Sequence, residues 1–208
     1  MTSIRTVLAA AITFFALVAL IPLAQAAPAN WRVWDPVTNT WTRGDGAPVN
    51  PPATPRGRSM SSPIPRQVVS YETKYKPGTI VVETAEHRLY YVLGNGEAIS
   101  YGIGVGRDGF RWSGQHTITR KAEWPGWTPP AQMRKRVPDL PAYMPGGPDN
   151  PLGARALYIG ATLYRLHGTS EPWTIGQNVS SGCIRLTNDD IIDLYNRVKV
   201  GSLVVVHQ

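Results

Sequence analysis

The chain has 208 residues and a formal net charge of +7, with 21 Lys and Arg residues against 14 Asp and Glu residues. The positive charge favours an anionic surface as the partner, and because it is spread along the chain it argues against nucleic acid. Cys183 is the only cysteine, which excludes an intramolecular disulfide.

Residues 1–26 have the pattern of a signal peptide. Arg5 gives a positive start, residues 7–20 are apolar, and small residues lead up to Ala26. We therefore expect cleavage near Ala26 and an exported protein, in the periplasm or associated with the cell wall. Removing this segment leaves 20 basic residues against 14 acidic ones, so the mature chain stays positive.

Two further segments precede the region with a regular pattern. Residues 27–43 hold three tryptophans, Trp31, Trp34 and Trp41, with turn-forming residues between them. They predict a small hairpin or a segment that packs on the main domain, with an aromatic sugar platform as the alternative. Residues 44–66 are rich in proline and nearly free of large apolar residues, which predicts an extended linker.

Residues 79–207 have the pattern of one mainly β domain. Gly94-Asn95-Gly96 predicts a tight hairpin between strands at residues 88–93 and 97–105. We expect a sandwich or open barrel of mixed strands, with one packed helix after Cys183. The other expected strands are at residues 79–84, 115–123, 155–159, 162–167 and 203–206, with 155–159 and 162–167 paired.

The expected helix covers residues 187–198. Thr187 and Asp190 fit a capping box, and apolar residues recur along one face of the segment. Residues 124–150, by contrast, are rich in Pro, Gly and Trp and have no steady period. A loop of that length inside a domain is typical of a binding or lid element.

Cys183 is a candidate nucleophile. A lone thiol in an exported protein is either buried and inert or kept for chemistry, and its reactive form is the thiolate. His167 is the best placed base, because Gly168 lets the chain turn sharply at the end of a predicted strand. Gly182 predicts a tight turn whose backbone N–H groups can bind an oxyanion. On spacing alone, two unrelated residues in one loop system explain the pattern equally well.

The residues around this pair resemble a known family. His167-Gly168-Thr169, followed by Ser180-Ser181-Gly182-Cys183-Ile184-Arg185, is similar to the motif of the L,D-transpeptidase catalytic domain, also called the YkuD-type domain. Many members carry His where this chain has Ser181, so a second imidazole near the thiol is missing here.

The resemblance implies acyl transfer on the cell wall. Cys183 would attack a peptidoglycan tetrapeptide stem between diaminopimelate and the terminal D-Ala, release D-Ala and hold the stem as a thioester. The acceptor would be an amine of another stem, which gives a 3→3 cross-link, or a lysine of an envelope protein. With water as the acceptor, the enzyme would be an L,D-carboxypeptidase. No cofactor is implied, and one Cys with scattered His gives no metal-ligand spacing.

The expected roles combine the chemistry with the resemblance. His167 would accept the thiol proton, and the carbonyl of Gly168 would fix its tautomer. Backbone N–H groups of Ser181, Gly182 and Cys183 would form the oxyanion hole. Five further residues are expected to bind substrate. For the arginine of this set the alternative role is to hold a loop, and for the others it is packing or turn formation. These residues are Arg185, Ser180, Tyr158, Trp173 and Asn178.

Two other classes of protein remain open. A sortase-like transpeptidase also uses Cys, His and Arg on a β scaffold, but its Arg comes from a separate strand, whereas Arg185 is two residues from Cys183. A non-catalytic wall-binding module would keep Cys183 as a buried structural residue. Reaction of the folded protein with a thiol reagent separates a nucleophile from an inert thiol.

Overall fold

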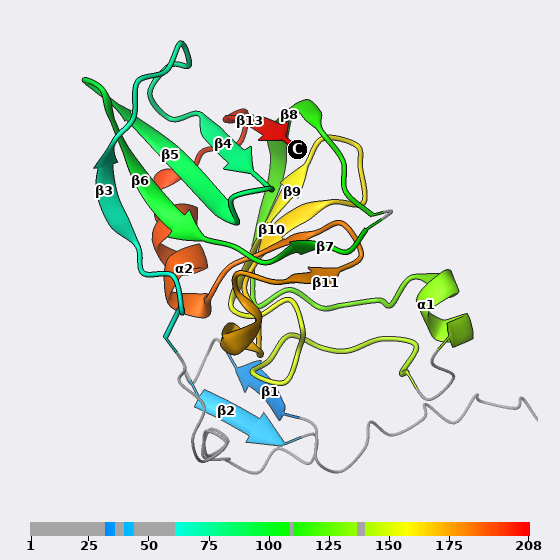
Figure 1. The fold of residues 1–208 in the computed structure, drawn as a ribbon. Helices are drawn as coiled ribbons and strands as arrows, with labels where there is room; N and C mark the ends of the chain where they lie inside the picture. Colours follow the sequence, from blue (N-terminus) through cyan, green and yellow to red (C-terminus); the bar gives the residue numbers. More distant parts are fainter. Residues whose placement is uncertain (1–31, 36–39, 44–60, 109, 137–139) are drawn as a thin grey trace, which may run out of the picture.

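The computed structural model describes residues 32–35, 40–43, 61–108, 110–136 and 140–208 (Figure 1). The predicted signal peptide and residues 44–60 of the predicted linker lie outside these ranges. Strands β1 (Arg32–Asp35) and β2 (Thr40–Arg43) pair antiparallel, as the predicted hairpin requires. No helix in the described part of the chain is long and apolar enough to cross a membrane.

Nine strands form one mixed sheet, in the order β12-β10-β9-β8-β13-β4-β5-β6-β3. β13 is parallel to β4 and β10 is parallel to β12, while the other neighbours are antiparallel. This confirms the mainly β fold with mixed strands. The nine strands are β3 (Gln67–Ser70), β4 (Ile80–Glu83), β5 (Arg88–Gly94), β6 (Glu97–Gly102), β8 (Gly114–Glu123), β9 (Arg155–Ile159), β10 (Arg165–His167), β12 (Ile184–Arg185) and β13 (Leu203–His207).

The predicted hairpin joins β5 and β6. Asn95 and Gly96 have φ values of +53° and +74°, a combination that suits Asn-Gly in a two-residue turn. The strand expected at residues 97–105 is interrupted, however, because β6 ends at Gly102. The chain resumes as β7 (Val105–Gly106), which pairs in parallel with β11 (Asn178–Ser180) in a separate two-stranded sheet.

Helix α2 (Asn188–Arg197) confirms the predicted helix and lies over the sheet (Figure 1). Thr187 is its N-cap, and the Thr187 hydroxyl accepts a hydrogen bond from the N–H of Asp190 at 3.2 Å. Ile191 and Leu194 are fully buried in one core shared by the helix and the sheet. The sheet side of that core includes Ile80, Val82, Leu89, Tyr101, Ile118, Leu157, Ile159, Leu166, Ile184, Val204 and Val206.

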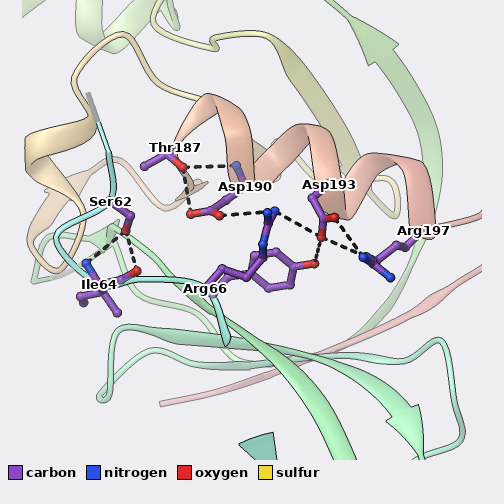
Figure 2. A network of polar contacts seen from close by, with 8 residues as sticks. Ser62, Ile64, Arg66, Thr187, Asp190, Asp193 and Arg197 are labelled. Atoms are coloured by element: carbon purple, nitrogen blue, oxygen red, sulfur yellow. Dashed lines mark hydrogen bonds and ion pairs between the residues drawn. The ribbon is translucent and has the colours of Figure 1, made fainter. Parts of the chain in front are cut away.

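The folded domain begins before residue 79. Strand β3 pairs with β6, and the last residues of the predicted linker pack on the domain. Figure 2 shows Arg66 directed at two carboxylates of α2, 3.7 Å from Asp190 and 3.4 Å from Asp193. Ile64 packs directly on Gly102. Ile64 and Arg66, at the end of the predicted linker, therefore contact the main sheet and helix α2.

The segment at residues 124–150 contains a short helix that the sequence did not predict, α1 (Ala131–Arg136). Hydrogen bonds within residues 124–150 also hold the two ends of this segment together. Trp127 and Met144 exchange backbone hydrogen bonds at 2.7 Å each, and the Asn150 amide donates to the carbonyl of Pro145 at 2.9 Å. A lid role for this segment stays a prediction.

Candidate active site

The register of β10 and β12 decides which side chains share a face of the sheet. Leu166 lies opposite Ile184, and both are buried in the core beneath α2. Successive side chains on a strand point to opposite faces, so their neighbours in sequence point away from α2. The residues on this second face are Arg165, His167, Cys183 and Arg185.

His167 and Cys183 therefore lie diagonally across two hydrogen-bonded strands, whose separation is about 4.8 Å. The charges of Arg165 and Arg185 act on the pKa of the imidazole and on the pKa of the thiol alike. This agrees with a single cluster of four side chains. The two reactive groups are on the same side of the core.

His167 is a buried side chain, 5% exposed. Its Nδ1 lies 2.6 Å from the carbonyl oxygen of Gly168, and because a carbonyl only accepts, Nδ1 carries the hydrogen. Nε2 of the neutral ring then carries the lone pair, and the backbone of Leu152 is a second hydrogen-bond neighbour of the imidazole. Burial, followed by the charge of Arg185, lowers the pKa of His167 to about 3. The imidazole is neutral at neutral pH and can accept a proton at Nε2.

Cys183 is partly exposed, and its Sγ lies 3.8 Å from the carbonyl oxygen of Leu163. Burial raises the pKa of the thiol, while the guanidinium of Arg165 works in the opposite direction. The sequence suggested a thiolate generated by the neighbouring His. The surroundings instead favour a neutral thiol beside a neutral imidazole, so that ionisation must accompany proton transfer.

A tight turn precedes Cys183. Gly182 has a φ of +106°, and a Cβ there would lie 2.5 Å from Cε1 of Tyr164, so only glycine fits. The N–H of Gly182 donates to Oγ of Ser180 at 3.1 Å, and Ser180 donates to the carbonyl of Cys183 at 2.5 Å. Ser180 thus holds the turn. The N–H of Gly182 already has a partner, which leaves those of Ser181 and Cys183 as the candidates for an oxyanion hole.

An aromatic pair supports this turn from outside. Nε1 of Trp112 donates to the carbonyl of Gly182 at 2.8 Å. The Trp112 ring stacks on Tyr164, with 4.5 Å between centroids and 6° between planes. His116 meets the same indole edge-on at 5.7 Å. The stack and the hydrogen bond fix the carbonyl of Gly182, and with it the direction of the chain entering Cys183.

Arg185 is buried and has partners within the protein. Its Nη2 donates to Oγ1 of Thr169 at 2.5 Å and to Oε2 of Glu171 at 2.9 Å. These contacts join strand β12, which follows Cys183, to the segment after His167. The structure therefore favours a loop-holding role for Arg185 over carboxylate binding.

The remaining predicted site residues are dispersed. Tyr158 of strand β9 pairs with Arg165 of strand β10, and its side chain lies on the same face of the sheet as the thiol. Trp173 belongs to the 3-10 helix η1 (Pro172–Thr174). Oδ1 of Asn178 lies 2.8 Å from Nε2 of His87, so the Asn178 side chain already has a hydrogen-bond partner within the protein. Of these three, only Tyr158 is connected to the cysteine by strand pairing, with Arg165 between them.

Sequence reasoning missed Arg165 and gave Asn188 no role. Oδ1 of Asn188 accepts from the N–H of Ala154 at 2.9 Å and lies against Gly168, so it braces the loop after the histidine. Arg165 could have been found, since it is two positions before His167 and residues two apart on a strand share a face. Within the described ranges, no group of three or more His, Cys, Asp or Glu side chains is placed to hold a metal ion.

The chain is similar to known proteins. Residues 77–206 match the family model YkuD, the L,D-transpeptidase catalytic domain. The Probable L,D-transpeptidase ErfK/SrfK of Escherichia coli K12 is 44% identical over 150 residues, which cover 69% of this chain and 47% of that protein. The Probable L,D-transpeptidase YbiS of the same organism is 42% identical over 159 residues, 72% of this chain and 50% of that protein. The chain spans about half the length of these curated relatives.

One solved structure is similar over most of its length. It is a Brucella melitensis protein described as a probable carnitine operon oxidoreductase, with 44% sequence identity and a TM-score of 0.49. The match covers 71% of this chain and 96% of that one. The description concerns that protein alone.

Proposed function

We propose that this chain, which belongs to the L,D-transpeptidase catalytic domain family, is a cysteine-dependent L,D-transpeptidase of peptidoglycan. The observation that carries the proposal is the parallel register of β10 and β12, because side-chain alternation then puts Cys183, directly before β12, on the same face as His167. The bond from Nδ1 of His167 to the carbonyl of Gly168 supports it, because Nε2 is then free to act as the base.

In the first half-reaction, the sulfur of Cys183 attacks the carbonyl carbon between diaminopimelate and the terminal D-Ala. The thiol proton moves to Nε2 of His167 as the C–S bond forms, and the N–H groups of Ser181 and Cys183 bind the oxyanion. Collapse of the intermediate breaks the C–N bond, and the proton passes from His167 to the leaving amine. The products are free D-Ala and a thioester on Cys183.

The second half-reaction reverses these roles. An amine attacks the thioester carbonyl and gives its proton to His167, the C–S bond breaks, and the sulfur of Cys183 takes the proton back. A stem amine as the acceptor gives a 3→3 cross-link, and a lysine of an envelope protein gives protein attachment. With water as the acceptor, the same steps are L,D-carboxypeptidase activity.

The electrostatics of the site fit a proton transfer that occurs only with substrate present. Burial and the charge of Arg185 disfavour an imidazolium in the free protein. The negative charge of a tetrahedral oxyanion beside His167 offsets both effects, because charges interact strongly in a site with little water. General-base catalysis of this kind is worth about 10²–10⁴-fold in rate.

We propose the same location that the sequence suggests. Residues 1–26 have a signal-peptide pattern and the remainder is positively charged, which suits an anionic cell wall. The protein would then act in the periplasm or at the cell wall after cleavage near Ala26.

Incubation of the purified protein with defined disaccharide tetrapeptides, followed by mass analysis of the products, tests the proposal. We expect loss of D-Ala together with 3→3 dimers, or tripeptides where water is the acceptor. Cys183→Ala and His167→Ala should abolish D-Ala release. A protein that is retained on sacculi but leaves every stem unchanged would instead be a wall-binding module.

A further inference from the structure

A row of side chains crosses four neighbouring strands and ends at the nucleophile. Arg120 of β8 pairs with Tyr158 of β9, which pairs with Arg165 of β10. The pairing of Leu166 with Ile184 places Cys183 in the next position of the row, on the chain that enters β12. With about 4.8 Å between strands, the backbone of Arg165 lies one strand spacing from that of Cys183, and the backbone of Arg120 lies three, about 14 Å away.

This row faces away from helix α2. Lys121, the next residue after Arg120, points to the helix, where its Nζ donates to the carbonyls of Tyr195 at 2.6 Å and Val198 at 2.7 Å. Side chains alternate along a strand, so Arg120 points to the opposite face, which is the face of the thiol. The neighbouring row carries only the small side chains of Ala122 and Ala156 beside His167. The row that ends at the thiol therefore carries two long cationic side chains, Arg165 next to Cys183 and Arg120 farther along.

Both arginines lie against the Tyr158 ring and lack an anionic partner. The guanidinium carbon is 3.5 Å from the ring centroid for Arg120 and 5.5 Å for Arg165. Among the described residues, no carboxylate is within ion-pair distance of either arginine. The buried Nε of Arg165 has no hydrogen-bond partner, although the rest of its side chain interacts with the Cys183 thiol and lowers the pKa of that thiol. Arg155 also has a buried Nε without a hydrogen-bond partner, but Arg155 and Arg185 each have a glutamate partner.

An arginine with an unsatisfied buried donor calls for an acceptor, and two neighbouring cations call for an anion. The guanidinium fork matches the geometry of a carboxylate, and Tyr158 restricts the orientation of both forks. A peptide stem in extended form advances about 3.3 Å per residue, so a carboxylate one to four residues from the reacting carbonyl falls along this row.

From this arrangement we propose that Arg165 and Arg120, held on the Tyr158 ring, form the subsite that binds a carboxylate of the donor stem next to Cys183. The inference rests on the proposed function and adds a specificity determinant to it. Two carboxylates of a tetrapeptide stem have the required chemistry, the terminal carboxylate of D-Ala and the side-chain carboxylate of diaminopimelate.

The test compares acid and amide forms of the stem. The rate of D-Ala or D-alaninamide release is measured as kcat/KM for the unmodified stem, for a stem with a terminal carboxamide, and for a stem amidated on the diaminopimelate side chain. The wild-type protein should prefer the acid over one of the two amides by about tenfold or more, the size expected for a charged hydrogen bond. That amide identifies the carboxylate.

Substitution at the subsite should then remove this preference. Arg165→Gln should bring the ratio of kcat/KM for the acid to that for the amide close to one, and Arg165→Lys should restore part of this ratio. Arg120→Gln, at an exposed position, should reduce the preference without affecting folding. The matched control is Arg155→Gln, an arginine of β9 on the helix side of the sheet, which should keep the wild-type preference.

Binding to the Cys183→Ser variant provides a readout that does not depend on turnover. Titration of that variant with the acid and amide stems should give the same discrimination in Kd, and Arg165→Gln in the same background should abolish it. Discrimination in Kd without any turnover would support the subsite and reject the proposed function. Turnover with equal rates for the acid and both amides would overturn the subsite and leave the function standing.

Discussion

Arg185 and His167 lie directly opposite each other on the parallel strands β12 and β10, and the buried guanidinium helps to hold the imidazole neutral. Arg185 is kept in place by Thr169 and Glu171, so its charge is a fixed part of the site. The base of the proposed reaction therefore sits under a permanent positive potential, which the oxyanion of the transition state offsets.

The lowered pKa of His167 predicts a dependence of stability on pH. The ordinary pKa is 6.5, and in the folded protein it is about 3, so between these values only the unfolded state binds the proton. The free energy of unfolding should fall by up to about 1.4 kcal/mol per pH unit from this residue alone as the pH decreases from 6.5 toward 3. Above pH 6.5 the imidazole is neutral in both states, so the stability lost at lower pH is fully present there.

Urea unfolding of the wild type and of His167→Asn at several pH values isolates this contribution from that of the carboxylates. The stability of the wild type relative to the variant should decrease steadily below pH 6.5. A difference that does not change with pH would mean that His167 titrates alike in the folded and unfolded states.

The raised pKa of Cys183 predicts how the free thiol reacts. Only the thiolate is alkylated, so the rate of iodoacetamide modification should rise with pH and reach its inflection above the ordinary thiol value of 9.0. Stopped-time alkylation with mass detection is specific, since the chain has one cysteine. A rate that is already maximal near pH 6 would indicate a preformed thiolate–imidazolium pair and contradict the neutral resting state.

Gly182 should be irreplaceable for two separable reasons, its backbone angle and its surroundings. Gly182→Ala combines a φ of +106° with a contact 2.5 Å from Tyr164, and we expect a loss of about 2–4 kcal/mol in unfolding free energy together with loss of D-Ala release. Gly201→Ala is the matched control, because Gly201 has a φ of +91° but nothing within 4 Å of the added methyl group. It should cost about 1–2 kcal/mol and leave activity unchanged. Equal costs in denaturant unfolding would show that the contact with Tyr164 does not matter.

The contacts of Arg185 predict that losing the arginine destabilises the protein more than losing its glutamate partner. Glu171 is half exposed, with 51% of its side chain accessible, so Glu171→Gln should cost less than about 1 kcal/mol. Arg185→Met should cost more, because the buried hydroxyl of Thr169 loses its bond from the guanidinium and keeps only the bond from the N–H of Glu171 at 3.0 Å. It should also raise the pKa of His167 toward 6.5, which NMR titration of the ring protons measures. Equal stability losses for the two variants, with no change in that titration, would argue against this role of Arg185.

Local signals predicted much of the fold. Asn95-Gly96 defines a hairpin because few residue pairs adopt two positive φ values in succession, and Thr187 defines a helix start because its hydroxyl caps the first turn. Both features depend only on neighbours in sequence. β3 and the packing of residues 61–66 were missed, because they depend on pairing with β6 and on ion pairs between Arg66 and α2.

The candidate site divides in the same way. The pairing of β9 with β10 could be predicted from residues 155–167, and with it the strand-end place of His167. The parallel pairing of β10 with β12 could not, because Cys183 comes 16 positions after His167 and the chain between them makes other contacts through η1 and β11. That pairing places Arg165 beside the thiol and sets Arg185 opposite the base. The sequence left Arg185 either as a carboxylate ligand or as a loop-holding residue. In the structure Arg185 has a glutamate partner, whereas Arg165 has none among the described residues.

The most direct test of the account is the mass of the intact protein after mixing with a carbapenem, which mimics the acyl donor. We predict a gain of one carbapenem mass, mapped to the peptide that contains Cys183, no gain in Cys183→Ala, and a rate about 10²–10⁴-fold lower in His167→Ala. An adduct that persists in Cys183→Ala, or a wild-type protein that gains no mass, would contradict the proposal that this sulfur forms the acyl-enzyme with His167 as its base.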